Sequence, residues 1–100
     1  MGELITILGA TGSVGRSTLS VLEQHPKDFE VFALTGNHQY EELAKQCLKY
    51  KPNFAVVMDP VVREKLTDLL NGQGSKTEVL QGQKGLCDVV SHPEVETVVA

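Results

Sequence analysis

The chain has 100 residues, of which 41% are apolar and 22% are charged, and its formal net charge at pH 7 is −4. These values are typical of a soluble globular protein, so we expect a single domain over residues 1–100. The acidic balance excludes a general attraction for nucleic acid or for anionic membranes. The longest apolar run, residues 54–58, is too short to cross a bilayer. We therefore expect neither nucleic acid nor a membrane as a partner.

The N-terminus and the two cysteines indicate a cytoplasmic protein. Met1-Gly2-Glu3 lacks the basic segment that opens a secretory signal, and Gly9 interrupts the apolar stretch that follows. Cys47 and Cys87 are far apart and have no Cys or His partner at metal-ligand spacing. We therefore expect both to be free thiols in a reducing compartment.

The first part of the chain alternates between strand and helix patterns. A β-rich run over 4–8 ends at Gly9 and predicts a strand, and a helix is expected from Ser13 to about His25, where Pro26 follows. The segment 30–34 predicts a second strand. The apolar residues at helical spacing in the first helix are Val14, Thr18 through its methyl group, Val21 and Leu22.

The same alternation continues to the end of the chain. A second helix is expected over 40–49, and the wholly apolar run 54–58 predicts a third strand covered on both faces. Asp59 and Pro60 suit the N-cap and first turn of a helix that reaches about Leu70. A fourth strand over 78–80, a fourth helix over 84–91 and a fifth strand over 95–100 complete the pattern. The expected inward-facing residues are Leu43, Ala44, Cys47 and Leu48 in the second helix and Val62, Leu66, Leu69 and Leu70 in the third.

Strands and helices that alternate about every 25 residues indicate βαβ units and a parallel sheet. The fold class that we expect is therefore α/β, a doubly wound and mostly parallel sheet. The apolar ending at Ala100 suggests the N-terminal domain of a larger enzyme.

Three glycines follow the first strand at intervals of three, namely Gly9, Gly12 and Gly15. This G-x-x-G-x-x-G spacing is one residue longer than the common dinucleotide-binding turn, G-x-G-x-x-G. Gly9 would permit the tight turn, Gly12 would let the backbone approach a pyrophosphate, and Gly15 would let the helix pack closely against the strand. The N–H groups at the start of the helix would then bind the phosphates.

Several other interpretations of the same letters remain open. Read from Ala10, the segment resembles the phosphate loop of a nucleotide hydrolase. In that interpretation Asp59, after an apolar strand, would be the acid that helps to bind magnesium. Arg16 stands where that loop needs lysine, and Asp59 is already explained as an N-cap. The chain could also be a flavodoxin-like or regulatory module that binds no dinucleotide, or the cofactor domain of another NADP-dependent reductase.

The end of the second strand indicates which dinucleotide would bind. An NAD site usually has an acid there to accept from the ribose 2′-hydroxyl, but residues 35–39 contain none before Glu41. A 2′-phosphate would be repelled by a carboxylate, so this segment favours NADP. His38 is the candidate contact to that phosphate, and Arg16 is a second possible one.

The residues provide no catalytic machinery of their own. His25 and His92 each precede a proline near a predicted helix end, where cap or surface roles are expected. No nucleophile–base set and no cluster of carboxylates for a metal is evident.

The sequence resembles the 1-deoxy-D-xylulose 5-phosphate reductoisomerase family. The matching stretches, from Leu4 to the end, are LITILGATGSVGRSTLSVLEQHP, FEVFALTGN, QCLKYKPNFAVV and GSKTEVLQGQKGLCDVV. The resemblance implies the N-terminal NADPH-binding domain of an enzyme that isomerises and reduces 1-deoxy-D-xylulose 5-phosphate to 2-C-methyl-D-erythritol 4-phosphate. It further implies a homodimer of the non-mevalonate isoprenoid pathway that needs Mg²⁺ or Mn²⁺ and is inhibited by fosmidomycin.

The resemblance also carries cofactor contacts onto this chain. The family's T-G-S-[IV] tetrad, which contacts the cofactor phosphates, corresponds to Thr11, Gly12, Ser13 and Val14. Many members have G-K-N after the second strand, where this chain has Asn37, His38 and Gln39, with Gly36 one place earlier. Because the family's metal ligands and catalytic residues lie beyond residue 100, none is assigned here, and we expect this chain alone to be inactive.

Overall fold

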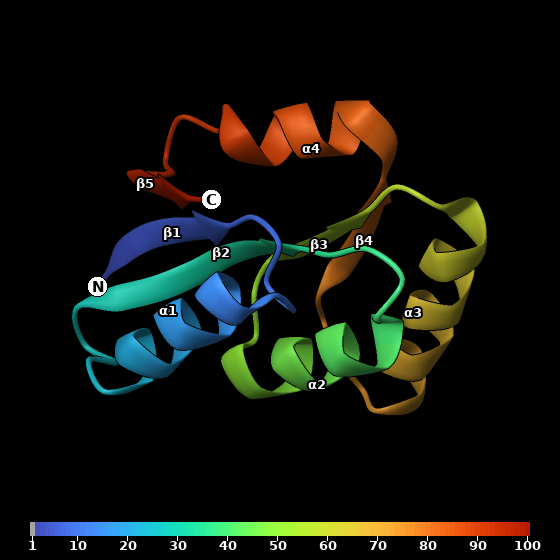
Figure 1. Cartoon of the computed structure of the whole chain (residues 1–100), viewed down its shortest axis with the longest axis horizontal. Helices are drawn as coiled ribbons and strands as arrows, with labels where there is room; N and C mark the ends of the chain where they lie inside the picture. The colour runs from blue at the N-terminus through green and yellow to red at the C-terminus, as the bar shows by residue number, and fades with distance from the viewer. Residues whose placement is uncertain (1) are drawn as a thin grey trace.

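The computed structural model describes residues 2–100, in which strands and helices alternate along the chain (Figure 1). The expected order of elements is therefore confirmed. The strands are β1 (Glu3–Ile7), β2 (Phe29–Thr35), β3 (Phe54–Val57), β4 (Glu78–Gln81) and β5 (Thr97–Val99), and the helices are α1 (Ser13–Glu23), α2 (Tyr40–Tyr50), α3 (Pro60–Gly72) and α4 (Gly82–Val90).

The five strands form one sheet in the order β4-β3-β2-β1-β5, and each of its four strand pairings is parallel. Helices α1, α2 and α3 cover one face, and α4 crosses the other face between β4 and β5 (Figure 1). The doubly wound α/β fold is thus confirmed. The chain runs outward from β1 to β4 and then returns to the opposite side of β1, so the direction of winding reverses between β1 and β5.

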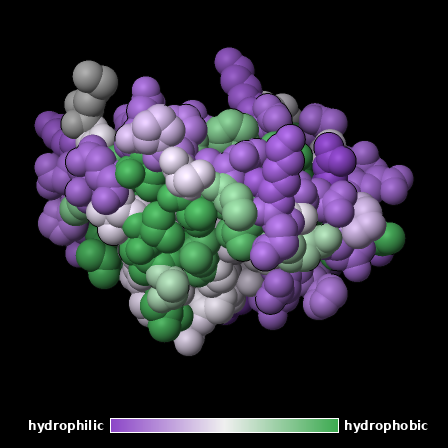
Figure 2. Space-filling view, turned by 90° about the horizontal axis from the view of Figure 1, so that it is seen from above, coloured by the Kyte–Doolittle hydropathy of each residue, from purple (hydrophilic) through white to green (hydrophobic). Residues whose placement is uncertain are grey.

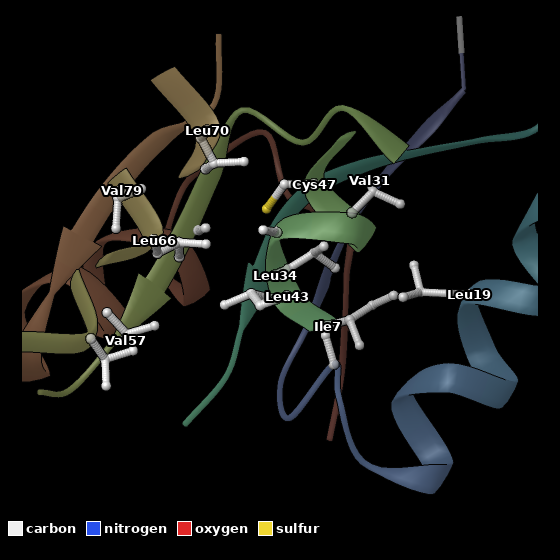
Figure 3. Packing of buried hydrophobic residues seen from close by; sticks show 14 of the residues in the cluster. Ile7, Leu19, Val31, Leu34, Leu43, Cys47, Val57, Leu66, Leu70 and Val79 are labelled. Carbon is white, nitrogen blue, oxygen red and sulfur yellow. The ribbon is translucent and has the colours of Figure 1, made fainter. Parts of the chain in front are cut away.

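The larger core lies between the sheet and the three helices on its first face (Figure 3). Ile7, Leu34, Leu43 and Leu66 are completely buried there. Burial of a leucine side chain contributes roughly 1.5–3 kcal/mol each, so this layer supplies much of the stability. It also fixes α1 and α2 against the carboxyl ends of β1 and β2.

A smaller core lies under α4 and contains Phe32, Ala33, Val56 and Val89. Phe32 and Ala33 are neighbours on the same side because the β1–β2 register slips there, Ile5 pairing with Val31 but Thr6 with Ala33. Viewed from above, where α4 crosses the sheet in Figure 1, a broad apolar patch is visible among hydrophilic side chains (Figure 2). Apolar side chains thus remain exposed on this side of the molecule.

Two helices bury a different set of residues from the one that the apolar pattern indicates. In α1 the buried residues are Gly15 and Leu19, whereas Val14 and Val21 are 60% and 56% exposed. Close contact at Gly15 turns this face of the helix inward. In α3 the prediction for Leu69 was wrong, because its side chain is 39% exposed while Val62, Leu66 and Leu70 are buried.

The last elements differ from prediction in their bounds. Helix α4 begins at Gly82, before the predicted start, and β5 is shorter than the expected 95–100. The backbone N–H of Val95 donates to the His92 carbonyl, so a turn occupies the start of the predicted strand. Both cysteines are free, as expected, with Cys47 buried and Cys87 exposed. Within residues 2–100, no helix has the length and apolar character needed to span a membrane.

Candidate functional site

The candidate site lies at the carboxyl edge of the sheet, where the winding direction reverses. Ile7 at the end of β1 pairs with Leu34 of β2 on one side and with Val99 of β5 on the other. The next residue, Leu8, donates its N–H to the Val99 carbonyl at 2.8 Å and holds β5 beside the start of the turn. Ligands of open α/β sheets bind at such a reversal, outside the carboxyl ends of the strands.

The glycines shape the turn that leaves β1. Gly9 has φ +64°, a left-handed conformation that other residues adopt only with strain. The Gly12 N–H donates to the Gly9 carbonyl at 3.0 Å and closes the turn. A Cβ at Gly15 would lie 2.5 Å from the Gly9 carbonyl oxygen and 2.7 Å from the Ala10 Cα. A close approach at Gly15 is therefore present, but the nearest backbone atoms belong to the turn and not to the strand that was predicted as its partner.

The start of α1 presents backbone N–H groups to solvent. Gly12 is the N-cap, and the first helical hydrogen bond runs from Arg16 N–H to the Gly12 carbonyl. The N–H groups of Ser13 and Val14 have no helical acceptor in this geometry, and none of the described side chains caps the helix. Its first turn also contains no acidic residue. Gly12, Ser13 and Val14 are exposed, so this helix end offers a positive dipole and free donors to an anion.

Thr35 at the end of β2 anchors the turn. Its side-chain Oγ1 accepts from the Gly9 N–H at 2.9 Å, and its carbonyl accepts from the Ala10 N–H at 2.8 Å. Sequence reasoning placed Thr35 at the end of the strand but did not assign it this role. The only sequence signal for this role is a threonine directly before Gly36 at the end of the strand.

The turn is also anchored from α2 by Gln46. The Gln46 side-chain Nε2 donates to the Ala10 carbonyl at 2.8 Å, although the residues are 36 positions apart. Sequence reasoning missed this residue. Its signal is a polar residue next to the buried Leu43, Ala44 and Cys47 on the inward side of a helix.

The second group of predicted residues lies after β2, at the same edge of the sheet. Gly36 is buried, its N–H donates to the Val56 carbonyl at 3.0 Å, and a Cβ there would lie 3.0 Å from a methyl of Leu43. Asn37, His38 and Gln39 are exposed. The fold thus brings the loop over 36–39 and the turn over 11–14 to the ends of adjacent strands.

Polar pairs join the exposed sides of α1 and α2. The Arg16 Nε lies 3.9 Å from the Glu42 Oε1, and the Lys49 Nζ lies 3.0 Å from the Glu23 Oε1. The hydrogen bond and the charge of Glu23 raise the pKa of Lys49 above its ordinary value. Arg16 is therefore part of a solvated helix–helix contact, and its predicted contact to the 2′-phosphate stays a prediction.

The geometry does not match a nucleotide hydrolase. Asp59 Oδ1 accepts from the Val61 N–H at 2.7 Å and caps α3, as its N-cap interpretation predicted. Strand β2 separates β3 from β1, which puts Asp59 about two strand spacings, roughly 10 Å, to the side of the glycine turn. Because Asp59 is used as a cap and Arg16 stands where the phosphate loop needs lysine, neither part of the hydrolase interpretation is supported.

The contacts of His92, His25 and Cys47 indicate no catalytic role. His92 packs against Phe32 with tilted rings whose centroids are 4.6 Å apart, and its Nδ1 accepts from the Glu94 N–H. His25 is exposed beside Asp28. Burial raises the pKa of the Cys47 thiol to about 12, which makes it a poor nucleophile. Among residues 2–100 no three His, Cys, Asp or Glu side chains are grouped to hold a metal ion.

A hollow of about 720 Å³ lies at the opposite edge of the sheet. It is lined by the segments that lead into β3 and β4, including Lys51, Asn53 and Lys76. Since α/β ligands bind at the carboxyl ends of strands, this hollow is not the expected cofactor site. The carboxyl edge is instead an open surface around the turn.

The strand order, the glycine turn at the winding reversal and the uncapped helix behind it define a Rossmann-like, doubly wound α/β domain. The sequence profile of the family described as 1-deoxy-D-xylulose 5-phosphate reductoisomerase matches residues 5–100, and the chain belongs to that family. It is 50% identical to the reductoisomerase of Pseudomonas fluorescens over 98% of this chain and 25% of the relative. It is 51% identical to that of Stutzerimonas stutzeri over 96% of this chain and 24% of the relative.

Solved structures give the same result. A DOX-P reductoisomerase in complex with NADPH, fosmidomycin and magnesium matches with a TM-score of 0.92 and 35% identity, covering 98% of this chain and 24% of that one. The Zymomonas mobilis enzyme in complex with NADPH matches with a TM-score of 0.84 and 32% identity, covering 94% of this chain and 24% of that one. The chain thus spans about a quarter of the length of the relatives it matches.

Proposed function

We propose that this chain is the NADPH-binding part of a 1-deoxy-D-xylulose 5-phosphate reductoisomerase. The observation that carries the proposal is the uncapped start of α1, presented by a glycine turn at the winding reversal of the sheet. Family membership and the likeness to a reductoisomerase in complex with NADPH support it.

The cofactor phosphates would bind the turn and the first residues of α1. The free N–H groups of Ser13 and Val14 suit the phosphate oxygens, and Thr11 and Gly12 adjoin them on the turn. Val14, 60% exposed in the chain as it stands, would be covered by the bound cofactor. This arrangement needs no basic side chain, which agrees with the acidic net charge of −4.

The adenosine end would bind the exposed loop over 36–39. Asn37, His38 and Gln39 offer amide and imidazole donors, and Glu42 faces Arg16 across the helices. Without a carboxylate among these three residues, the loop accepts a 2′-phosphate that an NAD-type site would repel. A charged imidazole at His38 would strengthen that contact.

The activity of the complete protein follows the family. We propose that it isomerises 1-deoxy-D-xylulose 5-phosphate and reduces the product, for which bound NADPH supplies the hydride. We propose that Mg²⁺ or Mn²⁺ binds to parts of the family's proteins that this chain does not span. Among residues 2–100, no three His, Cys, Asp or Glu side chains are grouped to hold a metal ion. We also propose that the complete protein is a homodimer in the cytoplasm.

Calorimetric titration of the chain with NADPH, NADH and ATP–Mg²⁺ tests the cofactor proposal. We expect weak binding of NADPH, weaker binding of NADH and no binding of ATP. Gly12→Val should remove NADPH binding, because its Cβ would stand 3.3 Å from the Gly9 carbonyl and add a branched side chain beside the free donors. Gly72→Val, at a glycine with open space around it on α3, is the matched control. Binding of ATP but not of NADPH would contradict the proposal and favour a nucleotide hydrolase.

A further inference from the structure

Gln46 is a polar side chain in an apolar position. It is 6% exposed, on the side of α2 that also buries Leu43, Ala44 and Cys47. Its Nε2 donates to the Ala10 carbonyl, while its Oε1 is buried with no hydrogen-bond partner among the described residues. The bond to the buried Ala10 carbonyl is stabilising, whereas the unpaired acceptor has a cost of similar size, so this glutamine adds little net stability. Stability alone therefore does not account for a glutamine here.

The one bond that Gln46 makes determines the orientation of a peptide group in the turn. In a planar trans peptide the C=O and the following N–H point in opposite directions. With the Ala10 carbonyl held toward α2, the Thr11 N–H must point away from α2. The two preceding N–H groups, of Gly9 and Ala10, are already bonded to Thr35. Gln46 is thus the side chain that orients the next donor of the turn.

We propose that Gln46 is a positioning residue for the cofactor phosphates, acting by holding the Ala10–Thr11 peptide so that the Thr11 N–H is available to them. This inference rests on the proposed NADPH binding and deepens it. Gln46 touches the turn from behind and makes no direct contact with the cofactor in this role. It acts through the backbone of a residue 36 positions away.

The first test compares affinity with stability in Gln46→Met, which keeps the length of the side chain and removes both the donor and the unpaired acceptor. We expect the Kd for NADPH, measured by fluorescence titration, to rise about tenfold, the effect of one well-placed hydrogen bond. The urea unfolding midpoint should change little, because the variant loses the unpaired Oε1 but also leaves the buried Ala10 carbonyl without its donor. Gln83→Met, an exposed glutamine on α4 across the sheet, is the matched control and should change neither quantity. A lower midpoint with an unchanged Kd would overturn the inference and leave Gln46 a packing residue.

The second test is rescue by protonation in Gln46→Glu. An ionised carboxylate cannot donate to the Ala10 carbonyl, whereas a protonated carboxyl can. Burial raises the pKa of a carboxyl, so protonation should occur in mildly acid solution. The ratio of the variant's Kd to that of the unaltered chain should therefore fall toward one as the pH is lowered. A ratio that does not change with pH would contradict the inference.

The inference and the proposed function can fail separately. In ¹H–¹⁵N NMR spectra without ligand, Gln46→Met should shift the Thr11 amide more than Gln83→Met does. If the unaltered chain does not bind NADPH, the proposed function fails. If NADPH binds but the Thr11 amide and the Kd respond equally to both substitutions, the proposed function stands and the role of Gln46 is refuted.

Discussion

The turn after β1 and the loop after β2 lie at the same edge of the sheet, but the fold holds them differently. The turn is closed on itself by Gly12, tied to Thr35 by two hydrogen bonds and tied to α2 by Gln46. In the loop, Asn37, His38 and Gln39 are exposed, and the His38 carbonyl accepts from the Tyr40 N–H. The turn would thus bind phosphate with fixed backbone groups, whereas the loop would recognise the adenosine end with side chains free to differ between relatives.

The largest effect should come from crowding the turn. Gly15→Ala puts a Cβ within 2.7 Å of backbone atoms of Gly9 and Ala10, so the turn or the helix must move. We expect a loss of roughly 1–3 kcal/mol in the free energy of unfolding, measured in urea, together with loss of NADPH binding. Gly72→Ala, with open space around it, should instead be neutral or stabilise by up to about 1 kcal/mol. Equal stability of the two variants would show that the turn is not tightly built.

A smaller effect is expected from removing one anchor of the turn. Thr35→Val deletes the Oγ1 that accepts from Gly9 and keeps the shape of the side chain. It should lower the free energy of unfolding by about 1 kcal/mol and weaken NADPH binding several-fold. Thr67→Val removes only a hydroxyl bonded within α3, to the Arg63 carbonyl, and should have little effect. If both variants bind NADPH equally well, the anchor plays no part in binding.

A change in the loop should alter cofactor preference without altering stability. His38→Lys places an ammonium group at the candidate contact to the 2′-phosphate. We expect NADPH to bind several-fold more tightly to this variant, with little change for NADH. Parallel changes for both cofactors would place His38 away from the 2′-phosphate.

The smallest effect should come from the exposed contact between α1 and α2. Glu23 raises the pKa of Lys49, so this contact stabilises the folded state at neutral pH and is lost as the pH rises above the ordinary lysine value of 10.5. Lys49→Met should therefore change the urea midpoint only slightly, and the difference should disappear in 1 M salt. A large change that persists in salt would mean that this surface pair helps to hold the turn.

Local patterns were sufficient to predict the order of the elements, the doubly wound sheet and a tight turn at Gly9. These features depend on neighbouring residues, such as glycine after a β-rich run and Asp59 before Pro60. The anchors Thr35 and Gln46 were not found, because their bonds join residues 26 and 36 positions apart. The apolar residues of α1 did not by themselves indicate its inward face, although close packing at Gly15 was predicted from the glycine spacing.

The most direct test of the central claim is to map NADPH binding on the ¹⁵N-labelled chain by NMR. If backbone donors at the start of α1 bind the cofactor phosphates, the amides of residues 11–14 should shift most, and those of 36–39 should shift with NADPH more than with NADH. Shifts concentrated at the opposite edge, among residues 73–78 around the large hollow, would contradict the account.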